Sequence, residues 1–162
     1  MAKPKPELDP LDLRILERYQ SDTRMPAQKI GAAVGLSAAA VQRRLKRMRE
    51  VGVIVAEVAQ LAPHTVGYPT TCIVGVRLER ESRAETARFK KAMTGHRQVQ
   101  QCYLVTGNVD FMLVVLARDM QDFEAFAQEA LYSDPNVKSF TTFVCLEPVK
   151  VSPNVPIVRP PR

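Results

Sequence analysis

The stretch PAQKIGAAVGLSAAAVQRRLKRMREVGVI, residues 26–54, decides the fold of the first part of the chain. It contains two short helical patterns, one ending near Val34 and one beginning at Ser37. Proline at position 26 suits the first turn of the earlier helix, and the hydroxyl of Ser37 can cap the later one. Because Gly35 permits a tight turn between them, the stretch predicts a helix-turn-helix.

Basic side chains dominate the outward face of the second helix. Val41, Leu45 and Met48 recur at the spacing of a single buried stripe, so Arg43 and Lys46 fall on the opposite side. The helix carries five Lys or Arg residues. A charge run alone favours a solvated face, but the turn, the cap and the preceding helix favour insertion into the major groove of DNA.

We expect the first turns of this helix to face base edges and its later cations to face phosphates. Alanine side chains allow close approach and can touch thymine methyl groups, whereas Gln42 can pair with adenine and Arg43 with guanine. The predicted base-edge contacts are Ser37, Ala38, Ala39, Gln42 and Arg43, and the predicted phosphate contacts are Arg44, Lys46 and Arg47.

The flanking segments complete the expected DNA-binding domain. Asp9 is placed to cap a first helix, with Pro10 at its first position and the charge of Asp12 near its positive end. After Gly52, residues 53–58 read as a short extended segment. We therefore expect a winged helix-turn-helix.

Length and composition bound the class of protein. The 162 residues suffice for one or two small domains, and 46% hydrophobic with 25% charged residues is typical of a globular protein. The net charge is +6, with 11 basic and 7 acidic residues up to Ala62 against 12 and 10 in the rest. This asymmetry favours a DNA-binding end joined to a more neutral domain.

Targeting and metal signals are lacking in the sequence. No apolar run is long enough for a transmembrane helix, and the start, MAKPKPELDP, has no apolar signal region. Cys72, Cys102 and Cys145 lie in apolar runs without metal-type spacing, which indicates reduced thiols. We expect a cytoplasmic, nucleoid-associated protein with no cofactor, no metal, no catalytic residues and no membrane partner.

The second half of the chain predicts the element order βαββαβ. This order is the split βαβ, or ferredoxin-like, α+β arrangement, with two helices on one face of an antiparallel sheet. Strands this apolar do not leave a whole face to water, so we expect a second subunit to cover it. The expected strands are residues 71–78, 99–105, 111–117 and 137–146, and the expected helices follow the caps Ser82 and Asp119.

The loop of the expected hairpin is a second site of interest. Gly107 admits backbone conformations that side chains forbid, and Asn108 and Asp110 place an amide and a carboxylate at a sheet edge. Such a loop can receive the ammonium and carboxylate groups of a small zwitterion. An ordinary hairpin turn is the alternative, because Gly, Asn and Asp dominate such turns.

Together, these features resemble the Lrp/AsnC family, the feast/famine transcription regulators of bacteria and archaea. The match covers nearly the whole chain, from about Leu8 to Lys150. Its markers are Leu8-Asp9 with Asp12, Gly35-Leu36-Ser37, Arg43-Arg44-Leu45 through Gly52-Val53-Ile54, residues 102–107 (CYLVTG), Asp110-Phe111, Asp119-Met120, and Thr142-Phe143-Val144 leading to Val149-Lys150.

The resemblance implies a winged helix-turn-helix joined to a sensing domain that dimerises, often into octamers, and binds amino acids or related molecules between sensing domains. The loop usually written Gly-Asp-Tyr-Asp in the family reads Gly-Asn-Val-Asp here, at residues 107–110. This departure leaves the identity of the effector open. The candidate effector site comprises Leu104, Gly107, Asn108, Asp110, Met120, Thr142, Phe143, Val144 and Cys145.

The expected function is a sequence-specific transcriptional regulator that binds a pseudo-palindromic operator in double-stranded DNA. One alternative is an enzyme, because siroheme decarboxylases look similar to this family, but only His64 and His96 are available as histidine proton donors. A nucleoid protein that compacts DNA is another alternative. The expected domains are DNA-binding at 1–62, a hinge at 63–69, sensing and dimerisation at 70–150, and a tail at 151–162 that extends across a partner and frays at 159–162.

Overall fold

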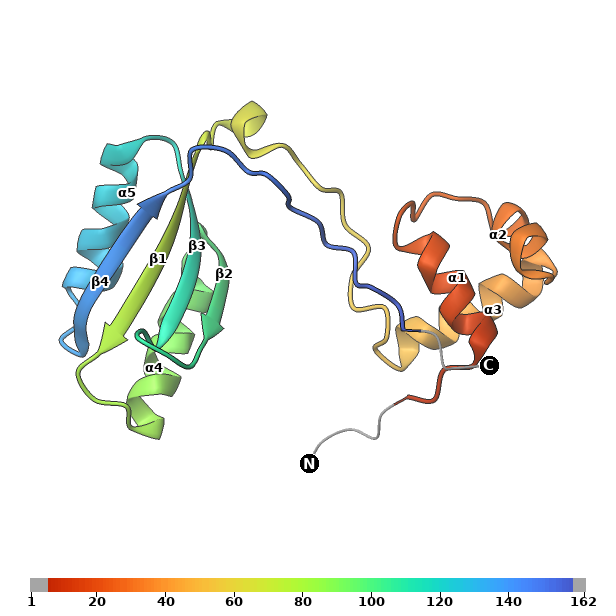
Figure 1. Cartoon of the computed structure of the whole chain (residues 1–162), viewed down its shortest axis with the longest axis horizontal. Coiled ribbons are helices and arrows are strands. Elements are labelled where there is room, and N and C mark those ends of the chain that lie inside the picture. The colour runs from red at the N-terminus through yellow and green to blue at the C-terminus, as the bar shows by residue number, and fades with distance from the viewer. Residues whose placement is uncertain (1–5, 159–162) are drawn as a thin grey trace. The chain divides into compact units, whose positions relative to one another are not determined.

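The computed structural model describes residues 6–158, so the first five residues of the expected DNA-binding domain and the last four of the expected tail lie outside it. The described chain divides into two compact units. One holds the residues up to Ala59 together with those from Lys150 onward, and the other comprises Gln60–Val149. Figure 1 labels the helices and strands of both units.

The first unit is built on three helices, α1 (Pro10–Tyr19), α2 (Ala27–Val34) and α3 (Ala38–Glu50). A reciprocal capping box begins α1: the backbone amide of Asp12 donates to Asp9 over 2.8 Å, and that of Asp9 donates to Asp12 over 3.1 Å. The N-cap predicted for α3 is confirmed, because the hydroxyl of Ser37 accepts from the amide of Ala40. The core of the unit is Ile15, Tyr19, Ile30, Val34, Val41, Leu45 and Met48.

Two glycines allow the turn between α2 and α3 to be tight. Gly35 ends α2 with a left-handed φ of 78°, which glycine adopts without steric cost. Gly31, inside α2, lies directly against the turn: a Cβ atom there would be 2.3 Å from the backbone oxygen of Leu36. The turn therefore requires glycine at both positions.

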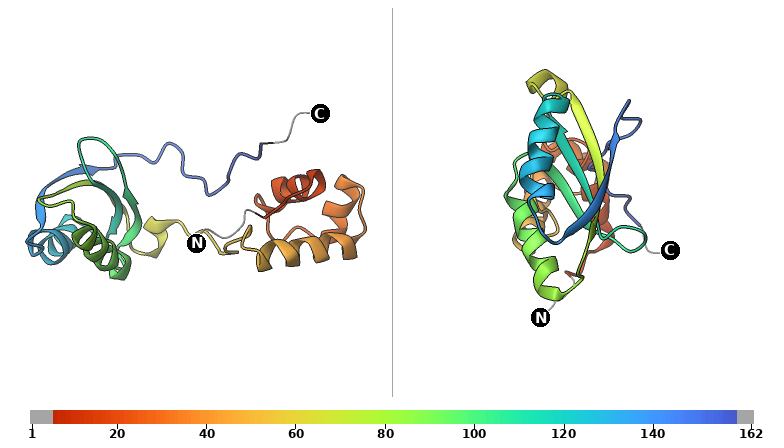
Figure 2. Two further views of the ribbon diagram at one scale, coloured as in Figure 1. Left: turned by 90° about the horizontal axis from the view of Figure 1, so that it is seen from below. Right: turned by 90° about the vertical axis from the view of Figure 1, so that its left-hand side faces the viewer.

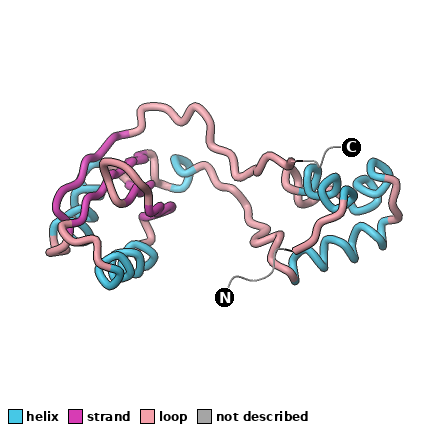
Figure 3. Tube along the Cα trace, turned by 60° about the horizontal axis from the view of Figure 1, so that its bottom comes forward, coloured by secondary structure: helices cyan, strands magenta, loops and turns pink. Residues whose placement is uncertain are grey.

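The segment after α3, predicted as a short extended wing, contains no strand. Residues 53–58 run as a loop (Figure 3). A lone extended segment cannot make a ladder, and within residues 6–158 no second segment of this unit pairs with it. The helix-turn-helix part of the prediction is confirmed by α2, the turn at Gly35 and α3.

Both chain segments that enter or leave this unit are fastened to the end of α1. Tyr19 donates a hydrogen bond to Glu57 of the outgoing loop. Gln20 exchanges two hydrogen bonds with the backbone of Val155 in the returning tail, each 3.0 Å long. Two consecutive residues therefore hold both segments.

The second unit has the predicted ferredoxin-like arrangement. Its sheet has the strand order β2-β3-β1-β4, with every neighbouring pair antiparallel. Its elements are a 3-10 turn at Pro63–Val66, β1 (Thr70–Leu78), α4 (Arg83–Gly95), β2 (Val99–Leu104), β3 (Phe111–Ala117), α5 (Met120–Ala127) continuing through a π-helical turn at Gln128–Tyr132, and β4 (Val137–Val144).

Helix caps and a buried amide fix the connections of this unit. Ser82 and Asp119 accept from backbone amides of the first turns of α4 and α5, as predicted. The side chain of Asn136, which is buried, both donates to and accepts from the backbone of Arg80. This pair ties the end of β1 to the start of β4.

The two faces of the sheet are unequal. Both α4 and α5 cover one face (Figure 2, right), where Phe89, Phe111 and Phe126 belong to the core. The opposite face, which we call the open face, is covered by no helix of residues 6–158. Its apolar side chains, identified from the strand register, are Ile73, Tyr103, Met112, Val114, Leu116 and Phe143.

Candidate DNA-binding and effector sites

The residues predicted to read bases lie on the solvent side of α3. Gln42 and Arg43 are exposed, as are Ser37 and Ala39, whereas Ala38 is half-buried. Within residues 6–158, neither Gln42 nor Arg43 has a hydrogen bond or ion pair to another side chain. Both side chains are therefore free to meet a ligand.

The remaining cations of α3 all have acidic partners. The Nη1 atom of Arg44 lies 2.5 Å from Asp9 and 2.8 Å from Asp12, and Arg47 pairs with the other oxygen of Asp12. Lys46 makes only a long surface contact, 3.9 Å from Glu50 in the next turn. The structure thus separates Arg43 from the other basic residues of the helix.

The carboxylate of Asp12 is the buried centre of this network. It is 0% exposed, and a buried carboxylate needs both hydrogen bonds and opposite charge. It obtains them from Arg44, Arg47 and the backbone amide of Asp9. Asp12 was predicted only as a helix-end charge. Its role could not be inferred from spacing, because its partners lie more than thirty residues further along the chain.

The neighbouring carboxylate of Asp9 is more accessible, with 46% of its side chain exposed. Burial raises its pKa, but hydrogen bonds from Arg44 and from backbone amides outweigh burial, so the pKa lies below its usual value. Hydrogen bonds to Asp9 and Asp12 raise the pKa of Arg44. Asp9, Arg43, Arg44 and Arg47 together line a cleft of about 350 Å³.

A second polar cluster joins the end of α1, the end of α3 and the outgoing loop. Arg49 donates to Glu57 through Nη2 at 2.7 Å and through Nε at 3.1 and 3.2 Å, and it also donates to the hydroxyl of Tyr19. Hydrogen bonds from Arg49 and Tyr19 lower the pKa of Glu57. Arg49, one of the five cations of α3, therefore binds the outgoing loop.

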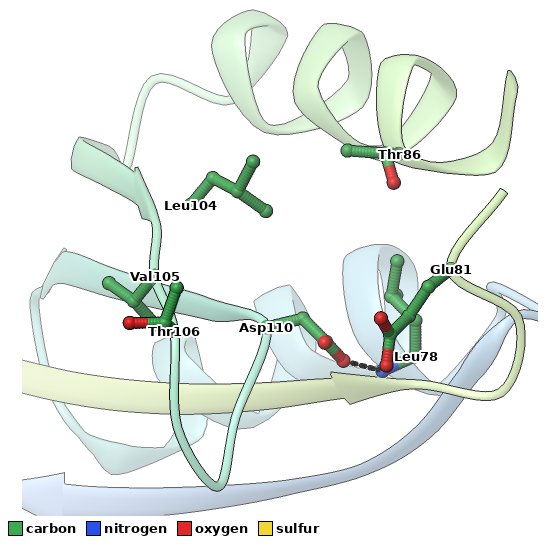
Figure 4. A pocket seen from close by; sticks show the side chains of 7 residues that line it. All are labelled: Leu78, Glu81, Thr86, Leu104, Val105, Thr106 and Asp110. Carbon is green, nitrogen blue, oxygen red and sulfur yellow. Dashed lines mark hydrogen bonds between the residues drawn. The ribbon is translucent and has the colours of Figure 1, made fainter. Parts of the chain in front are cut away.

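Part of the predicted effector site lines a real cavity. A cavity of about 360 Å³ lies where the ends of β1 and β2 approach the first turn of α4 (Figure 4). The carboxylate of Asp110 borders it and accepts a hydrogen bond from the amide of Leu78 over 2.6 Å. The lining residues are Leu78, Glu81, Thr86, Leu104, Val105, Thr106 and Asp110.

Only two of the predicted effector residues, Leu104 and Asp110, line this cavity, so the other five lining residues were not anticipated. Among those five, Glu81 and Thr86 come from the β1–α4 loop and from α4, for which the sequence offered no binding signal. Gly107, with a positive φ of 130°, and the exposed Asn108 belong to the hairpin loop but do not line the cavity.

The other predicted effector residues lie at the opposite end of the sheet. Val144 pairs with Cys72 near the start of β1, whereas Asp110 is bonded to Leu78 at its end. Six residues of strand separate these positions, or about 20 Å at 3.3 Å per residue. A single chain therefore does not bring the predicted effector residues together. The group at the far end comprises Met120, Thr142, Phe143, Val144 and Cys145.

The remaining reactive side chains show no catalytic grouping among residues 6–158. His64 is exposed, and the ring of His96 packs edge-on against Phe126 with centroids 5.5 Å apart. Burial raises the pKa of the Cys72 and Cys102 thiols. In the same span, no three His, Cys, Asp or Glu residues are placed to hold a metal ion, and no helix could cross a membrane.

Family models match both units of the chain. The AsnC-type helix-turn-helix domain matches residues 8–49, and the Lrp/AsnC ligand binding domain matches residues 71–155. The first match spans the three helices with their Arg44–Asp12 network, and the second spans the whole sheet. Together they account for both candidate sites.

Related sequences and solved structures agree with this assignment. The HTH-type transcriptional regulator y4tD of Sinorhizobium fredii is 42% identical over 93% of this chain and 89% of its own length, and the regulator AldR of Mycobacterium tuberculosis is 33% identical over 87% and 79%. An AsnC family regulator from Agrobacterium tumefaciens superimposes with a TM-score of 0.85 at 28% identity, covering 92% of this chain and 97% of its own. A transcriptional regulator from Neisseria meningitidis in complex with L-Met gives 0.85 at 25% identity, covering 93% and 97%. The chain belongs to the Lrp/AsnC family of transcriptional regulators.

Proposed function

We propose that this regulator reads a specific DNA sequence through the free side chains of α3. The observation that carries the proposal is the contrast within that helix: Gln42 and Arg43 are exposed and unpartnered within residues 6–158, while Arg44 and Arg49 are held by carboxylates. Free amide and guanidinium groups are those that pair with adenine and guanine. Ser37, Ala38 and Ala39 line the same approach, and Lys46 and Arg47 flank it toward phosphates.

The proposal is tested by a pair of alanine variants on an operator selected from random DNA by the purified protein. Arg43→Ala should reduce the ratio of operator to random-sequence affinity by at least tenfold, since a bidentate base contact is worth about 1–3 kcal/mol. Arg47→Ala should weaken both equally and flatten the salt dependence. Full-strength footprinting of the operator by Arg43→Ala would refute the assignment of the reading face.

We further propose that the open face of the sheet forms a homodimer. Its six apolar side chains make a contiguous patch across the strands, and patches of this kind mark association sites. Two-fold pairing presents two copies of α3 to DNA, so the operator should be a pseudo-palindrome. The family resemblance implies that such dimers assemble further into octamers, through contacts outside the open face.

The effector we propose is an amino acid or a related small molecule. The support is the cavity bordered by Asp110 together with the relative from Neisseria meningitidis, which is in complex with L-Met. Because the far-end group around Phe143 and Cys145 does not reach Asp110 within one chain, the complete site would need residues of a second chain. A thermal-shift screen of the amino acids tests this, since a ligand selective for the folded state raises Tm. A flat screen counts against it.

In this scheme residues 1–62 bind DNA, 63–69 form the hinge, 70–150 sense and dimerise, and 151–162 form a C-terminal tail that extends across a partner. An effector that prefers one assembly state shifts the population toward it and alters the spacing of the DNA-binding heads. The protein would act in the cytoplasm, bound to the nucleoid.

A further inference from the structure

The two carboxylates that hold Arg44 are not equivalent. Asp12 is fully buried and serves both Arg44 and Arg47, so the packing of α1 against α3 depends on it. Asp9 is half-exposed and adds a second carboxylate to the same Nη1 atom of Arg44, at 2.5 Å. The packing of the buried network requires the charge of Asp12, and it does not require the charge of the half-exposed Asp9.

The fold needs Asp9 only as a helix cap. Its Oδ1 atom accepts from the backbone amide of Asp12 at 2.8 Å, and its Oδ2 atom is the one that bonds Arg44. Asparagine caps helices as well as aspartate does. The negative charge of Asp9 is therefore dispensable for the cap, and its effect falls on Arg44 and on the cleft that Arg44 shares with Arg43 and Arg47.

We propose that Asp9 is a specificity-determining residue, whose carboxylate occupies the guanidinium of Arg44 and keeps DNA phosphates from binding it. This inference rests on the proposed reading of DNA by α3. Non-specific affinity grows with the number of phosphates that cations neutralise, whereas the proposed base readout depends on Gln42 and Arg43, to which Asp9 makes no hydrogen bond or ion pair within residues 6–158. Holding one cation back lowers binding to random DNA more than binding to the operator.

The variant Asp9→Asn tests this, because it keeps the cap and removes the charge. Binding of the full-length protein to a random-sequence duplex should strengthen several-fold at low salt. The slope of log K against log salt concentration should steepen by about one for each head that engages a phosphate. Affinity for the selected operator should rise less, so the ratio of operator to random-DNA affinity should fall.

A matched control separates this effect from a change in net charge. Asp22→Asn removes an equal charge from the same unit, where the carboxylate faces the exposed Arg24 at 3.8 Å and is remote in sequence from α3. It should leave the salt slope unchanged. Equal slopes and equal affinity ratios for Asp9→Asn and Asp22→Asn would overturn the proposal.

A second variant keeps the test decisive if Asp9→Asn fails to fold. Arg44→Gln removes the cation but keeps a side-chain N–H that can donate to the buried Asp12, which also retains Arg47. Because Asp9 already occupies the Arg44 guanidinium, the slope on random DNA should not change. A slope flattened by about one would show that Arg44 binds phosphate in the native protein and would refute the role of Asp9. Arg43→Ala, measured in parallel, reports on the reading face independently, so failure of either idea is recognisable.

Discussion

Asp110 accepts a hydrogen bond from the backbone amide of Leu78 over 2.6 Å, which fixes the hairpin loop against the end of β1. The backbone of Asp110 adds two more bonds, donating to Val76 and accepting from Val105 at 2.9 Å each. The residue expected to meet an effector is thus also the residue that holds the loop beside the cavity.

Asp110→Ala should lower the free energy of unfolding by about 1–3 kcal/mol, because it leaves the part-buried amide of Leu78 without its acceptor. Asp110→Asn, which retains an oxygen acceptor, should recover most of the loss. Urea denaturation of the full chain measures both. Equal destabilisation by the two variants would show that the charge, rather than the hydrogen bond, holds the loop.

Gly31→Ala should destabilise the DNA-binding unit by about 1–3 kcal/mol, the usual cost of overpacking, although alanine favours helix by about 1 kcal/mol over glycine. The added Cβ would meet the backbone oxygen of Leu36. A backbone atom cannot rotate out of the way as the end of a side chain can. The control is Gly95→Ala at the end of α4, where nothing lies within 4 Å of the new Cβ. Thermal unfolding of both variants decides the point, and equal Tm values would contradict the tight turn.

Glu57→Gln tests the cluster with Arg49 and Tyr19 through its pH dependence. The pKa of Glu57 is lowered below 4.5, so its charge stabilises the fold above that pH and the contribution is lost as pH falls through the folded pKa. The pair is partly exposed, so the variant should be less stable by only about 0.2–1 kcal/mol at neutral pH. This difference should shrink on acidification below about 4.5. If the difference in stability persists in acid, packing and not charge holds the loop.

Ile73→Asp should raise the dissociation constant of the proposed dimer at least tenfold. Ile73 lies in a central strand of the open face, paired with Val114 on one side and Phe143 on the other, so a carboxylate there would be buried without a partner. Leu146→Asp is the control, since Leu146 is 98% exposed and lies beyond β4. Sedimentation analysis over a range of concentrations compares them, and an unchanged dimer in Ile73→Asp would exclude this face.

Local signals in the sequence predicted most of the fold. Ser37, Ser82 and Asp119 cap the helices assigned to them, and the apolar run predicted as a strand at residues 111–117 forms β3. Such features depend on residues three or four apart, which is the range that periodicity and capping rules describe. The helix-turn-helix and the βαββαβ order follow from them.

What the sequence could not predict depends on residues far apart in the chain. The engagement of Arg44 by Asp9 and Asp12 spans over thirty residues, and Glu81 and Thr86 reach the cavity only because β1 and α4 fold around it. The pattern at residues 53–58 predicts an extended segment, but it does not show whether a second segment pairs with it to make a strand. Periodicity reports which face a residue occupies, and it does not report what lies opposite.

Tyr19 and Gln20 hold the outgoing loop and the returning tail at consecutive positions. The outgoing loop and the returning tail are therefore both bonded to the last turn of α1. A force along either segment therefore acts on the last turn of α1, and through Arg49, which bonds Tyr19, on the C-terminal end of α3, the end opposite Ser37.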